Sequence, residues 1–141
     1  MIGTIKWKEG DGKGAPISSV EDLLSKLRGI SGQTTKQSGI AAVLDKPSKQ
    51  ELIVIMAGPL WALNWFPEHY QGVGSYHTVA ETFDPDTDDL PQHPEVATYY
   101  ILGHHSEIPL AYLISEEDAV RGIREFFATA ERPSSMKWQL D

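Results

Sequence analysis

The sequence contains no cysteine among its 141 residues. This excludes disulfide bonds, thiolate metal sites and cysteine nucleophiles, and it is typical of a protein of the reducing cytoplasm. The sequence also has no run of eighteen apolar residues and no long apolar segment after Met1, so we expect neither a membrane span nor a signal peptide. We therefore expect a cytoplasmic protein whose residues 1–141 fold as one domain.

The middle of the chain has no basic residue. Between Gln50 and Val120 there is no lysine or arginine, and all 12 basic residues of the protein lie outside this segment. The same segment holds 12 of the 20 acidic residues, and the net charge is -8. Such a charge argues against binding to nucleic acid or to an anionic membrane, and it favours a basic partner.

The densest acidic run extends from Glu81 to Leu90, and aromatic residues lie near it in the sequence. Acids steer and select a basic partner, while buried aromatic rings supply most of the binding energy. The alternative is a solvated acidic loop that only keeps a small protein soluble.

Two segments have the apolar spacing of amphipathic helices. The first begins at Ser18, which forms a capping box with Glu21, and ends at Gly29. The second begins after the N-cap residue Ser115 and ends before Pro133. Both apolar faces predict helices that pack in the core and carry no candidate catalytic or binding residue.

The strand-like segments are short and separated by turn residues. Residues 39–44 and 52–57 flank a Pro-containing turn and predict a hairpin, and residues 61–66 add a third antiparallel strand. Residues 103–109 interrupt the β-rich run before them. The other predicted strands cover residues 4–8, 75–80, 97–102 and 136–140, and residues 111–114 form either a further strand or an extended lead-in to the second helix. The fold class is therefore α+β, a mostly antiparallel sheet of about six strands packed by two helices.

The last third of the chain resembles a known family. Residues 99–109 read Tyr-Tyr-Ile-Leu-Gly-His-His-Ser-Glu-Ile-Pro and residues 120–129 read Val-Arg-Gly-Ile-Arg-Glu-Phe-Phe-Ala-Thr, followed by Glu-Arg-Pro and then Lys137-Trp138. This order resembles the C-terminal signature of the first-numbered immunity-protein family of bacterial polymorphic toxin systems. Members of that family resemble the antidotes of deaminase toxins that act on double-stranded DNA.

The resemblance implies a protein without catalysis or cofactor that binds a cognate toxin in a one-to-one complex and blocks it. A nucleic-acid deaminase needs a basic channel for its substrate, and an acidic surface can occupy that channel. We therefore predict a toxin-binding site of acids and aromatic rings, namely Trp61, Trp65, Phe66, Glu68, His69, Tyr70, Glu81, Asp84, Asp86, Asp88, Asp89 and Glu95.

Two alternatives stay open. His104, His105 and Glu107 have the chemistry of a metal-dependent hydrolase, although adjacent strand residues point to opposite faces and no His-Glu-x-x-His motif is present. The other alternative is an acidic interaction module for an unrelated basic partner. We expect no metal site and no catalytic residue.

Overall fold

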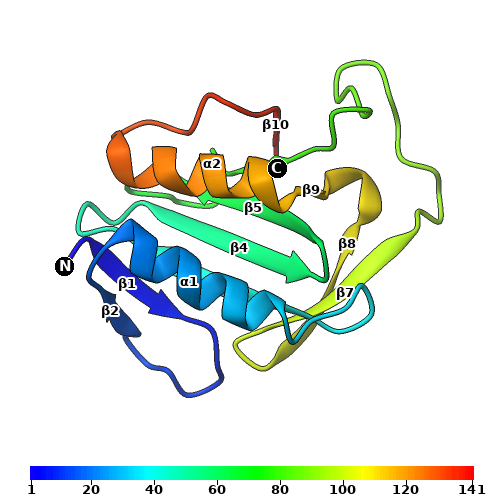
Figure 1. Cartoon of the computed structure of the whole chain (residues 1–141). Coiled ribbons are helices and arrows are strands. Elements are labelled where there is room, and N and C mark those ends of the chain that lie inside the picture. Colours follow the sequence, from blue (N-terminus) through cyan, green and yellow to red (C-terminus); the bar gives the residue numbers. More distant parts are fainter.

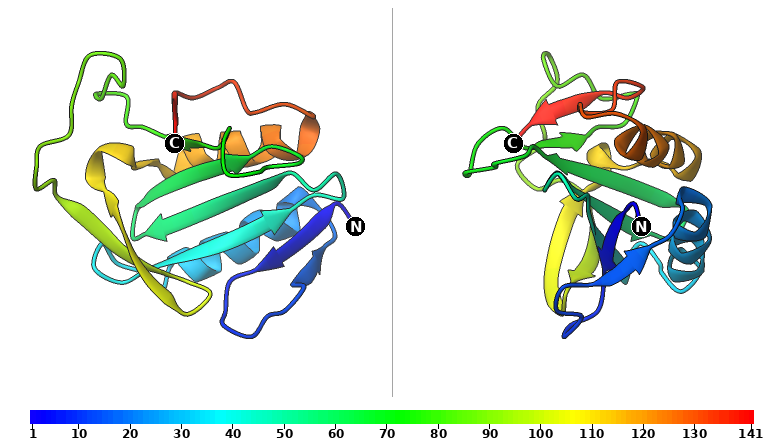
Figure 2. Two further views of the ribbon diagram at one scale, coloured as in Figure 1. Left: turned by 180° about the vertical axis from the view of Figure 1, so that it is seen from behind. Right: turned by 90° about the vertical axis from the view of Figure 1, so that its left-hand side faces the viewer.

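Three antiparallel strands form the centre of the sheet: β3 (Gly39–Asp45), β4 (Glu51–Ala57) and β5 (Leu60–Phe66) (Figure 1 and Figure 2). The computed structural model describes residues 1–141. Successive side chains of a strand point to opposite faces, and here both faces are largely covered, so all three strands are rich in apolar residues. The predicted hairpin and its third strand are confirmed.

The remaining elements extend this centre on both sides. The sheet has ten strands, and its main order is β10-β6-β5-β4-β3-β1-β2. A hairpin of β7 and β8 adds to β3 through a parallel β3–β7 pairing, and β9 pairs with β5. In chain order these elements are β1 (Gly3–Lys6), β2 (Ala15–Ile17), α1 (Val20–Ser31), β6 (Tyr76–Thr78), β7 (Val96–Ile101), β8 (His104–Pro109), a 3₁₀ turn η1 (Leu110–Tyr112), β9 (Ile114–Ser115), α2 (Glu116–Ala128) and β10 (Trp138–Leu140).

Both helices cover one face of the sheet (Figure 2). Leu24 and Leu27 of α1 and Ile123 and Phe126 of α2 are fully buried against that face. The strands contribute every second residue to this larger core, including Leu44, Leu52, Val54, Met56, Trp61 and Leu63. Neither helix has the length and apolar character required to cross a membrane.

The β7–β8 hairpin covers part of the opposite face (Figure 2). Ala97 and Ile108 of the hairpin pack on Ala41, Ile55 and Ala62 in a second, smaller core. The hairpin leaves the ends of β1, β3 and β4 near Asp45 uncovered on this face, where polar side chains replace apolar ones.

The structure confirms the α+β class and corrects the number of strands from about six to ten. The largest difference lies just after Leu102. The sequence predicts that residues 103–109 interrupt the strand, but residues 104–109 form β8. Leu102 and Gly103 both have positive φ, at 48° and 88°, and make a two-residue turn that joins Ile101 directly to His104. The short strand β2 was also missed, because three residues carry too little pattern to predict. Of the expected segment 111–114, only Ile114 lies in a strand, at the start of β9, and the segment's first two residues belong to η1.

The structure also corrects the first helix. Its N-cap is Ser19, whose hydroxyl accepts a hydrogen bond from the Asp22 amide, and not Ser18. The helix continues past Gly29 to Ser31, so Gly29 is an interior residue and not the stop. The N-cap of the second helix is Ser115, as expected, and its hydroxyl accepts a hydrogen bond from the Asp118 amide.

One acidic pair lies on the partly uncovered face, where Glu51 of β4 stands directly opposite Asp45 of β3. Burial raises the pKa of Glu51 to about 7, and a hydrogen bond to Asp45 and the negative charge of Asp45 act in the same direction. The positive charge of Lys6 opposes this shift. Glu51 is therefore a group whose folded environment favours the protonated carboxyl.

The first prediction concerns the pH dependence of stability. Because the folded-state pKa is raised, the stability from Glu51 is complete below its ordinary pKa of 4.5 and is lost as pH rises through about 7. The E51Q variant should exceed the parent in free energy of unfolding by about 1 to 3 kcal/mol at pH 8 and equal it near pH 4.5. Denaturant unfolding at both pH values measures this, with E131Q as an exposed control. Equal stability of E51Q and the parent at pH 8 would contradict it.

The second prediction compares two helical glycines. Nothing lies within 4 Å of a Cβ added at Gly29, so G29A should raise the free energy of unfolding by about 0.5 to 1 kcal/mol. A Cβ at Gly122 would meet Met136 Cε at 2.4 Å and Leu63 Cδ1 at 2.8 Å. G122A should therefore lower the free energy of unfolding by about 1 to 3 kcal/mol. Chemical denaturation of both variants tests the pair, and a stabilised G122A would show that Met136 moves aside without cost.

Candidate functional site

The acidic loop, residues 81–95, lies within the long connection between β6 and β7 and projects from the fold (Figure 1, upper right). Backbone hydrogen bonds close its base: the Ala80 amide donates to the Ala111 carbonyl at 2.7 Å and the Leu110 amide to the Glu95 carbonyl at 2.9 Å. Lys137 Nζ also donates to the Glu81 carbonyl at 2.8 Å. Both ends of the loop are therefore held against one short region of the fold.

Two carboxylates of the acidic loop shape its backbone. Asp84 accepts a hydrogen bond from the Asp86 amide at 2.9 Å, and Asp88 accepts one from the Asp84 amide at 2.8 Å. The Asp88 amide in turn donates to the Asp84 carbonyl at 2.7 Å. Hydrogen bonds from the Asp86 amide and from the Thr87 hydroxyl lower the pKa of Asp84, so its charged form holds this turn.

The other carboxylates of the loop are available to a partner. Glu81, Asp86, Asp89 and Glu95 are exposed, and their side chains form no hydrogen bond or ion pair within the chain. The aromatic ring of Phe83 contacts that of Tyr112 in η1 edge to face, with ring centroids 6.2 Å apart, and so anchors the loop to the body of the fold. The loop thus presents free negative charge on a backbone that its own side chains hold in place.

The structure places two of the predicted aromatic residues in the core. Trp61 is fully buried, and its indole Nε1 donates to the Ser31 hydroxyl at 3.2 Å. Trp65 is 9% exposed and its ring faces Tyr76 at 6.3 Å. Both point to the helix side of the sheet because they occupy the inward positions of β5. This corrects their assignment as contact residues, because a partner cannot reach them.

The other predicted aromatic group lies at the opposite end of β5. Phe66 and Tyr70 pack edge to face with centroids 5.0 Å apart, and Nε2 of the exposed His69 lies 3.2 Å from Oε1 of Glu68. Strand β6 pairs antiparallel with β5 and therefore runs back toward the Leu60 end of β5. The acidic loop follows β6 and so starts near that end, where β9 also pairs with β5. The seven residues of β5 separate the two groups by about 20 Å. The structure therefore brings the acids of residues 81–95 together but does not join them to residues 66–70.

Two supporting residues of the loop were not predicted. Tyr112 and Lys137 hold its base, and they lie in η1 and just before β10, far from the loop in sequence. The Tyr112 ring also packs against the His77 ring in a tilted arrangement, with centroids 4.1 Å apart. No local pattern marks either residue, because each contact depends on how the chain ends return to the sheet.

The histidines considered as metal ligands do not converge. His104 and His105 are adjacent in β8 and therefore point to opposite faces. His105 packs edge to face on Tyr100 at 5.4 Å. No group of three or more histidine, cysteine or acidic side chains is arranged to hold a metal ion.

Comparison with known proteins assigns the chain to a family. The family model described as Immunity protein Imm1 matches residues 11–140. No curated protein matches the chain. The family match confirms the resemblance seen in the last third of the sequence and extends it to the N-terminal part. Because it spans both helices, the acidic loop and every strand except β1, the chain belongs to the Imm1 family of immunity proteins.

Proposed function

We propose that this immunity protein inhibits a cognate toxin that deaminates nucleic-acid bases, by placing its acidic loop over the active site or substrate channel of the toxin. Family membership supports the general role of an immunity protein. The observation that carries the specific proposal is the acidic loop itself, with four exposed carboxylates that pair with nothing in the chain.

The chemistry of the target explains the sign of the charge. An enzyme that modifies nucleic acid lines its channel with basic residues that contact phosphates. A projecting set of carboxylates can occupy the same positions and repel the substrate from the channel. Glu81, Asp86, Asp89 and Glu95 are the groups that contact basic residues of the toxin in this proposal.

The conformation of the loop also favours binding. Asp84 and Asp88 already hold the turn in the free protein, so less conformational entropy is lost when the toxin binds. Phe83 and Tyr112 limit the movement of the base of the loop. The protein then acts in the cytoplasm as a one-to-one inhibitor that performs no catalysis and needs no cofactor.

The third prediction tests the acidic loop by charge reversal. The D86K/D89K variant should bind the cognate toxin domain at least tenfold more weakly, about 1.4 kcal/mol, because two attractive charges become repulsive. Both substitutions leave Asp84 and Asp88 in place, so the loop turn is retained. Calorimetric titration and protection of cells that express the toxin measure the effect.

The matched control is E9K/E131K, which changes the net charge by the same amount at exposed acids outside the loop. This control should bind and protect like the parent. If both double variants lose affinity equally, only total charge matters and the acidic-loop mechanism is wrong. If D86K/D89K binds like the parent, another surface contacts the toxin.

The fourth prediction concerns association kinetics. Steering by exposed charges is screened by salt, with a Debye length of about 10 Å at 0.1 M and about 3 Å at 1 M. The association rate constant should therefore fall at least tenfold between these salt concentrations, while the dissociation rate constant changes little. Surface-plasmon measurements on the parent and on D86K/D89K test this. An association rate of the parent that does not depend on salt would contradict electrostatic steering.

A further inference from the structure

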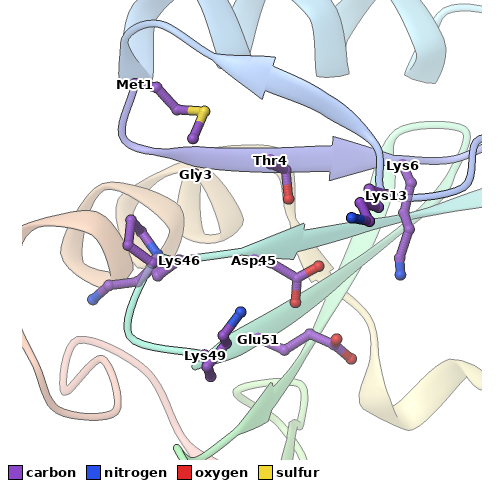
Figure 3. A pocket seen from close by; sticks show the side chains of 10 residues that line it. Met1, Gly3, Thr4, Lys6, Lys13, Asp45, Lys46, Lys49 and Glu51 are labelled. Carbon is purple, nitrogen blue, oxygen red and sulfur yellow. The ribbon is translucent and has the colours of Figure 1, made fainter.

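A second charged site lies at the other end of the molecule. A cavity of about 560 Å³ opens on the partly uncovered face, between β1, the β1–β2 loop and the β3–β4 turn (Figure 3). We call it the lysine pocket. Its lining residues are Met1, Gly3, Thr4, Lys6, Lys13, Asp45, Lys46, Pro47, Lys49 and Glu51.

Three of its four lysines are unpaired. Lys6, Lys13 and Lys49 come from three different segments, and their ammonium groups form neither an ion pair nor a hydrogen bond within the chain. Figure 3 shows them spread around Asp45 and Glu51. Lys46 differs, because its Nζ donates to the Phe126 and Thr129 carbonyls at 2.7 and 2.6 Å and so is used at the end of α2. A third of the basic residues of this acidic protein therefore line one cavity.

The carboxylates of the pocket do not cancel this positive charge. Only Asp45 and Glu51 are acidic, and because the pKa of Glu51 is raised to about 7, this carboxyl is only partly ionised near neutral pH. The three unpaired ammonium groups then exceed the negative charge. Unpaired ammonium groups that line one cavity can bind an anion, because the anion supplies the partners that the chain does not.

We propose that the lysine pocket binds a small, multiply charged oxyanion of the phosphate class, held by Lys6, Lys13 and Lys49. The volume lies within the range of small-molecule sites, which is about 300 to 1,000 Å³. A polynucleotide is a poor candidate because the net charge of -8 repels it. This inference does not depend on the identity of the toxin.

An adjoining groove points to two sources of the phosphate group. This groove of about 400 Å³ shares Lys49 and Glu51 with the lysine pocket and is lined further by Phe66, His69 and Tyr70. Tyr70 is 40% exposed and borders this groove, so an aromatic side chain is available to a planar group. An inorganic polyphosphate would use the lysine pocket alone, whereas a nucleotide would also place its base in the groove.

The proposal has a pH signature because Glu51 faces the bound anion. The titratable groups around Glu51 are Asp45 of β3, Lys6 of β1, Lys13 of the β1–β2 loop, Lys46 and Lys49 of the β3–β4 turn, and His69 and Tyr70 of the β5–β6 loop. The anion is held more weakly when Glu51 carries its charge. Affinity should therefore decrease as pH rises through the range in which Glu51 loses its proton.

The fifth prediction is that the lysine pocket binds phosphate-class anions at pH 7. Calorimetric titration of the full chain with pyrophosphate and with ADP measures this binding. Both should bind, and the K6A/K13A/K49A variant should lose at least tenfold in affinity. The control K8A/K26A/K36A removes the same charge from lysines outside the pocket and should bind like the parent. If ADP binds more tightly than pyrophosphate, the natural source of the phosphate group is a nucleotide. If the two bind equally, the source is an inorganic polyphosphate. Equal losses in both triple variants, or no binding of either probe, would overturn the proposal.

A second variant keeps the test valid if the lysine variant unfolds. E51Q should bind sulfate, which keeps its charge between pH 5.5 and 8, severalfold more tightly than the parent at pH 8 and equally at pH 5.5. Parent and variant are compared in an H69Q background, because histidine side chains also change charge in this range. Glutamine keeps the size of the side chain and removes only the charge. Weaker or unchanged binding by E51Q at pH 8 would overturn the proposal.

Discussion

The two-sided burial of β3, β4 and β5 is the constraint on which the rest of the structure depends. Alternating side chains of these strands enter two different cores, one under the helices and one under the β7–β8 hairpin. Because both faces must be covered, α1, α2 and the hairpin are all required to shield one sheet from water. Trp61 and Leu63 illustrate this, since both are fully buried on the helix side while the intervening Ala62 packs under the hairpin.

The covering of both sheet faces also determines where charged side chains lie. Charged groups are costly in either core, so they collect where the covering elements end. One such place is the connection between β6 and the hairpin, which carries the acidic loop. The other is the corner near Asp45 that the hairpin does not reach, where lysines surround a carboxyl pair. The protein thus has two charged sites of opposite sign at the two ends of its central strands.

Much of the fold was predictable because its causes are local. The hairpin of residues 39–57, the third strand and the cap of the second helix follow from apolar alternation, turn residues and a serine hydroxyl. Strand β8 was not predictable, because its polar residues His104 to Glu107 form a strand only by pairing with β7. Gly29 was assigned as a helix stop, yet the packing of Leu27 and Ile30 carries the helix past it.

By itself, the sequence determined the class of the fold, the separation of acidic from basic residues, and the family signature near the C-terminus. These are properties of composition and of short sequence patterns, which do not depend on tertiary contacts. Only the tertiary structure decided that Trp61 is a core residue, that Asp84 and Asp88 shape the loop that carries Asp86 and Asp89, and that lysines distant in sequence meet in one cavity. The physical reason is that burial and convergence depend on pairings between strands far apart in the chain.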